Sequence, residues 1–497
     1  MTDRPNILLL LVDQWPALAF AHRGMAVRTP NTDRLAGQGT VFTNAFTSCT
    51  LCSPARGALL TGRWPSQTGF CDNYGTGYST QAPLSSDERT WIDAAVAAGY
   101  RTGYFGKWHC GTDGPILRGA HAHDESCDRR VPYDPAKGGH SYEQVARRYT
   151  RAAAAMGSTA GSEPQLLAGR PPFWGRLRAS KEEHRAFRLA ERGVSFLEEH
   201  VRSGPDRPFF LTVSWPDPHF PHYLPAEYAE LAEQSMPDLP PNLEDTFAGK
   251  PAFHRTAWWP SMDTAALSPD DWRRVIAYSR AHYSMADEAV GRVLAGLDRL
   301  GLSENTRVVF AADHGDMCGA HNRFDKGPYF YDEVWRIPLI VRCPGRPPAE
   351  QAAFVSIVDV GATFFDLIGS PAPAPGKPRA GRALTDLLGT AEHGACWPEE
   401  TFAMYDLYNG MSFAVRGIRT GCWKYLWNPQ SVDELYDLET DPAELTNLAG
   451  RPEVADAEKM LRARLFAWMD EVGDDLPARA DALPAAGTIL ATGQMGP

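Results

Sequence analysis

The sequence contains no apolar run long enough to form a membrane-spanning helix. Such a helix needs about 20 consecutive apolar residues, whereas the longest run in this chain, residues 7–12, has six. This run ends at Asp13 and no small-residue cleavage site follows, so we interpret it as a buried strand rather than a signal peptide. We therefore expect a cytoplasmic protein with no membrane partner.

Cysteines are also few, and dense clusters of basic residues are absent. Nine cysteines in 497 residues are too few for a disulfide scaffold, and we expect most thiols to be reduced. The 49 basic and 61 acidic side chains give a net charge of −12, and no segment is dense in Lys and Arg. This balance argues against a nucleic acid partner. It permits an anionic small-molecule substrate, because a site needs only a few local cations.

The composition is that of a folded globular protein, with 43% hydrophobic and 22% charged residues. Apolar runs that end in turn residues alternate along the chain with helical stretches. This alternation predicts an α/β fold in which helices sandwich a large, mostly parallel sheet. The expected strands cover residues 5–12, 39–45, 101–105, 208–214 and 306–312. The expected helices cover residues 29–37, 53–61, 90–98, 185–200 and 272–300.

A second, smaller unit is expected after the Pro- and Ala-rich connection at residues 368–382. We predict a catalytic domain at residues 1–380 and a C-terminal α+β subdomain at 381–497. The aromatic-rich segments of the subdomain predict an antiparallel sheet, followed by a helix near residues 455–471. Two stretches without periodicity, 112–180 and 225–265, are expected to cover the strand ends and shape a pocket.

The segment Cys49-Thr-Leu-Cys52-Ser-Pro-Ala-Arg56 is the strongest chemical signal in the sequence. By its residues alone, the Cys49/Cys52 pair could be a redox dithiol or half of a zinc site. A thiolate at a helix N-terminus beside Arg56 would be stabilised electrostatically. The sequence offers no second closely spaced Cys or Cys/His pair for the remaining zinc ligands. A non-enzymatic thiol or metal-binding protein stays open as an alternative.

Polar segments follow four of the other expected strands. They are Asp13-Gln14, Gly106-Lys107-Trp108-His109, Asp217-Pro218-His219 and Asp313-His314, with Lys326-Gly327 a dozen residues later. Each segment alone is typical of an ordinary turn. Because the carboxyl ends of parallel strands meet in one crevice, their joint occurrence beside Cys52 predicts a single site.

The pattern Cys52-x-Pro54-x-Arg56, followed by Thr61-Gly62, resembles the formylglycine-dependent sulfatases of the alkaline phosphatase superfamily, and the other segments match this family in chain order. The resemblance implies that a maturation enzyme oxidises Cys52 to formylglycine, the nucleophile. It also implies that His109 helps to release sulfate and that His219 protonates the leaving group, with Lys326 bridging to it. The implied catalytic residues are Cys52, Arg56, Lys107, His109, His219 and Lys326.

One divalent metal ion is the implied cofactor, with Asp13, Gln14, Asp313 and His314 as its ligands. Carboxylate and amide oxygens suit a hard ion, so we expect Ca²⁺ first and Mg²⁺ as an alternative. The imidazole of His314 moves the preference toward Mn²⁺. Many members of the family carry an acid in place of Gln14 and Asn in place of His314, so the identity of the ion stays open.

These residues together predict a sulfatase that hydrolyses an aryl, sugar or alkyl sulfate monoester. Three cations would balance the negative charge of the sulfuryl group, and two histidines would titrate near neutral pH. Asn73 is predicted to contact the substrate, and the aromatic cluster of His254, Trp258 and Trp259 hints at a flat or sugar-like leaving group. The alternative is a phosphonate monoester or phosphodiester hydrolase of the same superfamily, against which the Gly-Lys-Trp-His segment argues. The Pro- and aromatic-rich insertions are compatible with a homo-oligomer.

Overall fold

A large, mostly parallel sheet forms the centre of the computed structural model, which describes residues 4–76, 78–112, 114–124, 163–164, 174–204, 207–256, 264, 267–370, 380–394 and 397–490. The eight strands lie in the order β11-β2-β10-β9-β1-β7-β3-β4, and β10 is antiparallel to its neighbours. Their bounds are β1 Asn6–Val12, β2 Thr40–Phe46, β3 Arg101–Gly106, β4 Ala122–Asp124, β7 Phe209–Ser214, β9 Thr306–Ala312, β10 Leu339–Arg342 and β11 Ala349–Ser356.

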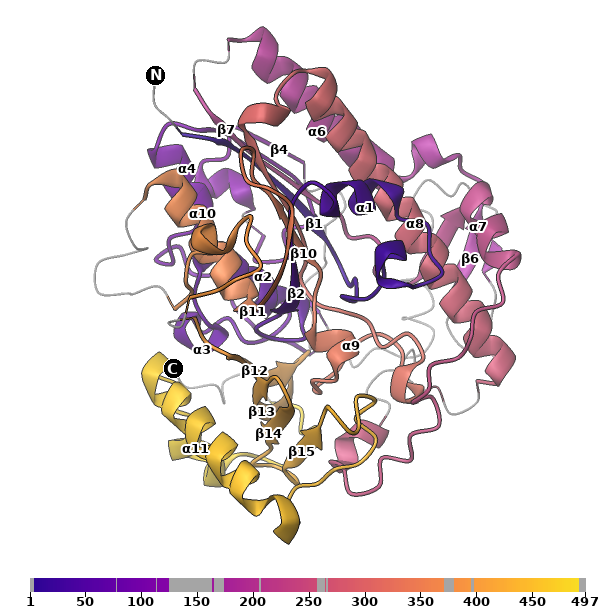
Figure 1. Ribbon diagram of the computed structural model, residues 1–497, viewed down its shortest axis with the longest axis vertical. Coiled ribbons are helices and arrows are strands. Elements are labelled where there is room, and N and C mark those ends of the chain that lie inside the picture. The colour runs from indigo at the N-terminus through magenta and orange to yellow at the C-terminus, as the bar shows by residue number, and fades with distance from the viewer. Residues whose placement is uncertain are drawn as a thin grey trace.

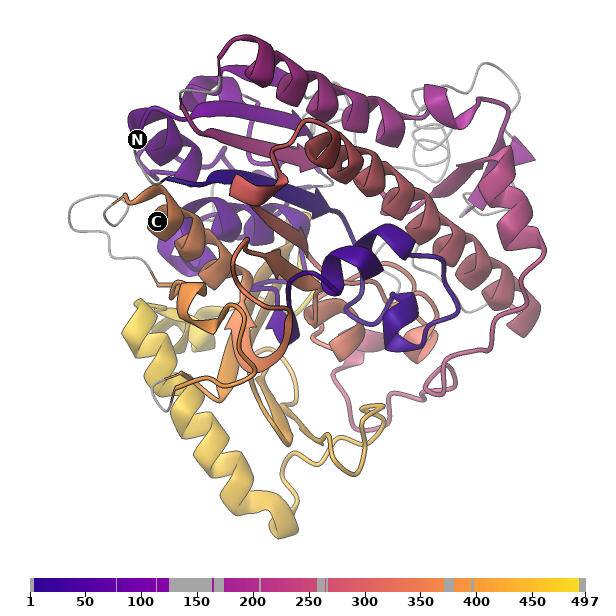
Figure 2. The same ribbon diagram turned by 45° about the horizontal axis from the view of Figure 1, so that its top comes forward.

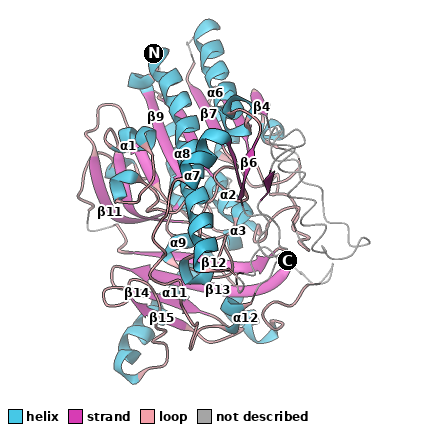
Figure 3. Ribbon diagram, turned by 90° about the vertical axis from the view of Figure 1, so that its right-hand side faces the viewer, coloured by secondary structure: helices cyan, strands magenta, loops and turns pink. Residues whose placement is uncertain are grey.

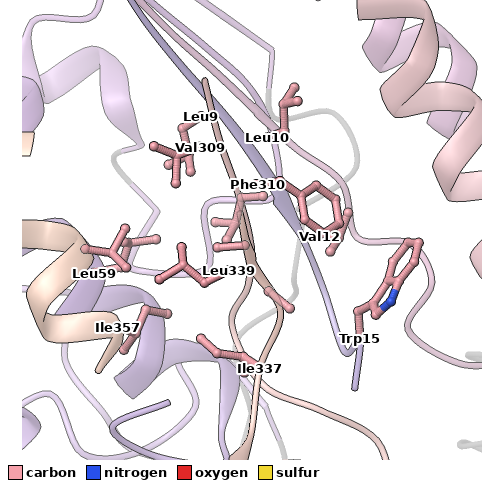
Figure 4. Close-up of a cluster of buried hydrophobic side chains, with 14 of the residues drawn as sticks. Leu9, Leu10, Val12, Trp15, Leu59, Val309, Phe310, Ile337, Leu339 and Ile357 are labelled. Atoms are coloured by element: carbon pink, nitrogen blue, oxygen red, sulfur yellow. The ribbon is translucent and has the colours of Figure 1, made fainter. Parts of the chain in front are cut away.

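Strand β1 lies at the middle of this sheet, in parallel pairing with β7 and β9. All seven of its residues are buried, because helices cover both faces of the sheet. A strand enclosed on both faces is apolar throughout rather than alternating, and this explains the run Ile-Leu-Leu-Leu-Leu-Val. Figure 4 shows Leu9, Leu10 and Val12 of β1 within the hydrophobic core, close to Val309 and Phe310 of β9.

Helices cover the two faces of the sheet in two groups (Figures 1 and 2). Helices α2 (Cys52–Thr61), α4 (Trp91–Ala97) and α10 (Ile357–Ile368) pack against one another on one face. Helices α1 (Pro30–Ala36), α6 (Arg185–Arg202) and α8 (Pro269–Arg299) cover the other face. The predicted α/β sandwich is confirmed, while β10, β11 and α10 are additions to the predicted elements.

The C-terminal part forms a separate four-stranded antiparallel sheet below the large sheet (Figure 3). Its strands are β12 (Glu400–Tyr408), β13 (Met411–Thr420), β14 (Trp423–Trp427) and β15 (Glu434–Asp437), and helix α11 (Ala455–Val472) packs on β13 and β14. The predicted α+β subdomain is confirmed. Its boundary at residue 380 stays a prediction, and most of the predicted connection, residues 371–379, lies outside the described residues.

Smaller elements occupy the insertions and the loops between the main strands. They are β5 (Glu163–Pro164), β6 (Trp174–Leu177), β8 (His222–Pro225), α3 (Pro65–Thr68), α7 (Ala226–Glu233), α9 (Asp332–Trp335) and α12 (Leu476–Arg479). Strands β5, β6 and β8 form a third sheet. Among the described residues, no helix combines the length and the apolar character that a membrane crossing requires.

Candidate active site

The polar segments found in the sequence meet at the carboxyl edge of the large sheet. Asp13 follows β1, Lys107 follows β3, His219 follows β7 and Asp313 follows β9. The N-terminus of α2, which begins at Cys52, points into the same place. The predicted convergence of the strand ends is therefore observed.

Four buried side chains form the centre of the site, and they are Asp13, Cys52, Asp313 and His314. Their ligand atoms all lie within 4.8 Å of one another. Nδ1 of His314 donates to the carbonyl oxygen of Gly315 over 2.8 Å, which turns Nε2 toward the other three groups. That Nε2 atom lies 3.1 Å from Sγ of Cys52. Two carboxylates and an imidazole nitrogen facing one point form a donor set that fits a divalent cation.

Gln14 lies beside this cluster with its backbone in the left-handed region, at a φ of 64°. Its backbone amide donates to Oδ1 of Asp313 over 3.2 Å. Its side-chain Oε1 accepts a hydrogen bond of 3.2 Å from Nζ of Lys326. The side-chain oxygen of Gln14 is thus hydrogen-bonded to Lys326 beside the cluster, and its role as a metal ligand stays a prediction.

Arg56 is fully buried behind the cluster and orients one of its carboxylates. Its Nε donates to Oδ2 of Asp313 over 2.8 Å, and its Nη1 donates to Oγ of Ser214 over 2.9 Å and to the carbonyl of Lys107 over 3.0 Å. Burial acts to lower the pKa of this guanidinium, but Asp313 and Asp13 outweigh it and raise the pKa. Arg56 therefore stays charged and links the ends of β3, β7 and β9.

Two lysines bring further positive charge to the centre. The ammonium of Lys107 makes an ion pair with the carboxylate of Asp13. The ammonium of Lys326 donates to Nε2 of His219 over 2.8 Å and to Oδ1 of Asp325 over 3.0 Å. Both lysines are buried, so little solvent screens their charge.

These cations set the protonation of the central groups. Burial acts to raise the pKa of Asp13, but the charges of Lys107 and Arg56 outweigh it and hold that pKa well below its usual range. Burial and Asp13 also act to raise the pKa of the Cys52 thiol, and Lys107 with Lys326 brings it below the ordinary value. The site therefore favours negative charge on both Asp13 and Cys52.

His219 differs from the expectation that it titrates near neutral pH. Burial and the neighbouring Lys326 lower its pKa well below 6.5, so the ring is neutral. Its Nδ1 donates to the carbonyl of Phe220 over 2.7 Å, which leaves Nε2 as the acceptor from Lys326. The proton shared by this pair consequently resides on Lys326, whose pKa is raised by Asp325 in spite of burial.

Asn73 and His109 contact the N-terminus of α2. Oδ1 of Asn73 accepts a hydrogen bond of 3.0 Å from the Ser53 amide, in a helix whose own N-cap residue, Leu51, provides no side-chain cap. The carbonyl of His109 accepts from Oγ of Ser53 over 2.7 Å. Substrate contact by Asn73 stays a prediction, and the structure adds a capping role.

Asp217 lies in the segment Asp217-Pro218-His219, but the sequence pattern did not predict a structural role for its carboxylate. Its buried carboxylate accepts hydrogen bonds from Arg185 over 3.1 and 3.3 Å and from Nε2 of His282 over 3.0 Å. Its carbonyl accepts from the amide of Asp13 over 3.2 Å. The position of Asp217 after a strand was the available signal, whereas its partners on α6 and α8 are visible only in the fold.

The remaining candidates lie elsewhere. The thiol of Cys49 is buried among apolar and aromatic residues, and burial raises its pKa well above the ordinary value. It is not among the converging ligand atoms of the described residues, so the Cys49/Cys52 metal site is not formed. His254 is buried and its Nδ1 bonds to the hydroxyl of Tyr331, while Trp258 and Trp259 lie outside the described residues.

Comparison with known proteins agrees with this geometry. A family model described as Sulfatase matches residues 5–370, and a model described as N-sulphoglucosamine sulphohydrolase, C-terminal, matches residues 319–471. The chain is 29% identical to the uncharacterized sulfatase YidJ of Escherichia coli, covering 97% of this chain and 92% of the relative. It is 28% identical to an ulvan-active sulfatase of Formosa agariphila, covering 96% and 83%.

Solved structures share the fold over nearly the whole chain. One, in complex with its substrate D-glucosamine-2-N,6-O-disulfate, matches with a TM-score of 0.71 at 22% identity and covers 95% of this chain and 99% of its own. A phosphonate monoester hydrolase of Agrobacterium radiobacter matches with a TM-score of 0.68 at 24% identity and covers 94% and 96%. The first family model spans well over half of the sequence, so the chain belongs to the sulfatase family.

Proposed function

We propose that this chain hydrolyses a sulfate monoester to an alcohol and inorganic sulfate, with Cys52 as the precursor of the nucleophile. The observation that carries the proposal is the convergence of Cys52, Asp13, Asp313 and His314 within 4.8 Å. Lys107 and Lys326 add two buried ammonium groups to the same point. A sulfuryl group in transfer carries negative charge, and preorganised cations stabilise such charge most strongly in a buried site.

The proposed cofactors are formylglycine at Cys52, made by a maturation enzyme, and one divalent ion. Ca²⁺ is the first choice, with Mg²⁺ and Mn²⁺ as alternatives, because Asp13, Asp313 and Gln14 offer oxygens and His314 offers one nitrogen. When bound, these groups supply a hydroxyl nucleophile, a second hydroxyl for turnover, and a Lewis acid that polarises them. The donor set and the orientation of His314, whose Nε2 faces the cluster, support this assignment.

The residues of the chain have separate tasks in this proposal. Arg56 fixes Asp313, and Lys107 lies on Asp13, so both hold the negative ligands in place. The Lys326–His219 pair holds a proton at Nζ of Lys326 for the leaving oxygen. His109, whose Nε2 lies 3.1 Å from the Tyr74 carbonyl, is the proposed base for sulfate release.

A saccharide sulfate is the substrate class that we propose first, supported by the relative named an ulvan-active sulfatase. The chain is 28% identical to that relative over 483 residues. The phosphonate monoester hydrolase shares only the fold at 24% identity, and its activity carries no weight for this chain.

The test is a paired substrate screen on matured, metal-loaded protein. The substrates are 4-nitrophenyl sulfate and 4-nitrophenyl phenylphosphonate, which share a leaving group, followed by a panel of sulfated monosaccharides. We expect kcat/KM to be at least about 100-fold higher for the sulfate, and the Cys52→Ala variant to lose both activities. A higher kcat/KM for the phosphonate, or full activity of Cys52→Ala, would overturn the proposal.

A further inference from the structure

The tip of a C-terminal hairpin is seated in the loop that follows the nucleophile helix. Asn409 and Gly410 form the turn between β12 and β13, with φ values of 52° and 88°. Positive φ at both positions is typical of a two-residue hairpin turn. A Cβ on Gly410 would lie 2.4 Å from the Tyr78 carbonyl group, so only glycine allows this close approach.

Asp72 binds this turn through backbone hydrogen bonds. One of its carboxylate oxygens accepts from the amide of Asn409 and the other accepts from the amide of Gly410, each over 2.7 Å. The first oxygen also accepts from the amide of Asn73 over 2.7 Å. The side chain is fully buried, so an Asp72 carboxylate without these donors would be costly.

The side chain of Asn409 adds a second set of contacts. Its Oδ1 accepts hydrogen bonds from Oγ1 of Thr76 over 2.7 Å and from Nδ2 of Asn73 over 3.4 Å. Its carbonyl accepts from the amide of Tyr78 over 2.8 Å. The turn is therefore linked to Asn73 in two ways. Asp72 accepts from the backbone amides of both the turn and Asn73, and Oδ1 of Asn409 accepts from the side chain of Asn73.

The same loop contacts the catalytic groups on its other side. Oδ1 of Asn73 caps the Ser53 amide in the first turn of α2, next to Cys52. The amide of Tyr74 donates to Oγ of Ser53 over 3.0 Å, and the carbonyl of Tyr74 accepts from Nε2 of His109 over 3.1 Å. Residues 72–74 thus connect the hairpin turn to α2 and to His109.

We propose that Asp72 is a positioning residue, through which the Asn409–Gly410 turn of the C-terminal subdomain fixes the N-terminus of α2 and the imidazole of His109. The proposal rests on the proposed sulfatase function for its kinetic consequence only. Its structural part concerns the order of α2 and can be measured without turnover. The C-terminal subdomain is then a component of the active site, although the central residues all come from the N-terminal domain.

Asp72→Asn tests the proposal directly, because an amide places an NH₂ group against backbone donors. Asp287→Asn is the matched control: Asp287 is also fully buried and caps α1 by accepting from the amides of Asn31 and Thr32 on the other face of the sheet. Hydrogen exchange of the peptide covering residues 51–56 and kcat for 4-nitrophenyl sulfate are measured for both variants.

In Asp72→Asn we expect exchange in the first turn of α2 to accelerate at least about tenfold and kcat to fall by about 100-fold, the cost of a misplacement near 1 Å. In Asp287→Asn we expect both quantities to stay within about threefold of wild type. Asn409→Gly keeps the turn and removes only the side-chain acceptor, and it should lower kcat by about tenfold. If Asp72→Asn does not fold, the exchange and kcat measurements on Asn409→Gly alone test the proposal.

Wild-type exchange and wild-type kcat in both Asp72→Asn and Asn409→Gly would overturn the proposal. Equal losses in Asp72→Asn and Asp287→Asn would also overturn it, because they would indicate a general stability effect. If the wild-type protein hydrolyses neither 4-nitrophenyl sulfate nor any sulfated monosaccharide of the panel, the proposed function is contradicted, and the exchange comparison still decides whether Asp72 positions α2.

Discussion

At the scale of single residues, Lys326 holds the proton of the Lys326–His219 pair, and His219 is the hydrogen-bond acceptor. Lys326 donates to the neutral ring of His219, and the pKa of His219 lies well below its ordinary value because of burial and this neighbouring charge. From the sequence, His219 is predicted to protonate the leaving group, with Lys326 bridging to it. The sequence could not show that Lys326 holds the proton of this pair, because that depends on the distance between the two side chains and on their burial.

Replacement of Lys326 should therefore affect poor leaving groups most. We expect Lys326→Met to lower kcat/KM by about 10³-fold for an alkyl or sugar sulfate, which needs a proton on the leaving oxygen, and by much less for 4-nitrophenyl sulfate. Lys250→Met is the control, since Lys250 is a buried lysine paired with Asp245 outside the site. Equal losses for both classes of leaving group in Lys326→Met would contradict the assigned role.

The carboxylate of Asp13 is expected to control metal content. In Asp13→Asn, we expect metal analysis to find well below one ion per chain and turnover to disappear, because one charged ligand is lost. Chelation of the wild-type protein should abolish activity and lower Tm, and Ca²⁺ should restore both. Asp359→Asn changes a half-buried carboxylate that accepts from the amides of Ser356 and Arg382 outside the site, and it should keep its metal. A full metal complement in Asp13→Asn would contradict the ligand assignment.

At the scale of elements, the segments with strong local patterns were predicted closely. The expected strand 5–12 is β1, and the expected helix 53–61 is α2, which begins one residue earlier at Cys52. In contrast, β10 has only four residues, too few to show a strand period, and α10 combines its helical pattern with several β-branched residues, which favour strands. The sequence pattern could not predict the partners of Asp217 and Asp72 either, because each of these carboxylates joins elements that lie far apart in the sequence.

Strand β13 holds a buried ion cluster that should make stability depend on pH. Arg416 is fully buried and pairs with Asp474 and with Asp406. Burial acts to raise the pKa of Asp474, but Arg416 outweighs it and holds the pKa below its ordinary value. A depressed pKa contributes stability above the unfolded value near 4, and this contribution is lost as pH falls through the folded pKa.

Asp474→Asn should lower the free energy of unfolding at pH 7 by about 3–5 kcal/mol, because Arg416 loses a buried partner. The neighbouring Asp475→Asn removes only an exposed pair with Arg479 and should cost less than about 1 kcal/mol. Urea titrations at pH 7 and at about pH 3 measure both variants. The difference between Asp474→Asn and wild type should shrink at the lower pH, and an equal difference at both values would contradict the account.

At the scale of the whole molecule, the site is assembled from every part of the chain. Its central residues lie between positions 13 and 326, and the hairpin turn that supports them lies at 409 and 410. The parallel sheet explains this arrangement, since its strand ends converge at one edge whatever their separation in sequence. The chain carries a net charge of −12, yet three buried cations, Arg56, Lys107 and Lys326, gather at this edge. Such a local reversal of charge suits an anionic substrate.

The central claim is that Cys52 is the precursor of the nucleophile, and mass spectrometry tests it most directly. Trypsin releases residues 35–56, a peptide that contains both Cys49 and Cys52. From active protein made with a maturation enzyme, we predict that Cys49 alkylates as an ordinary thiol while Cys52 has the mass of an aldehyde or its hydrate. An unmodified thiol at Cys52 in protein that still hydrolyses sulfate esters would contradict the account.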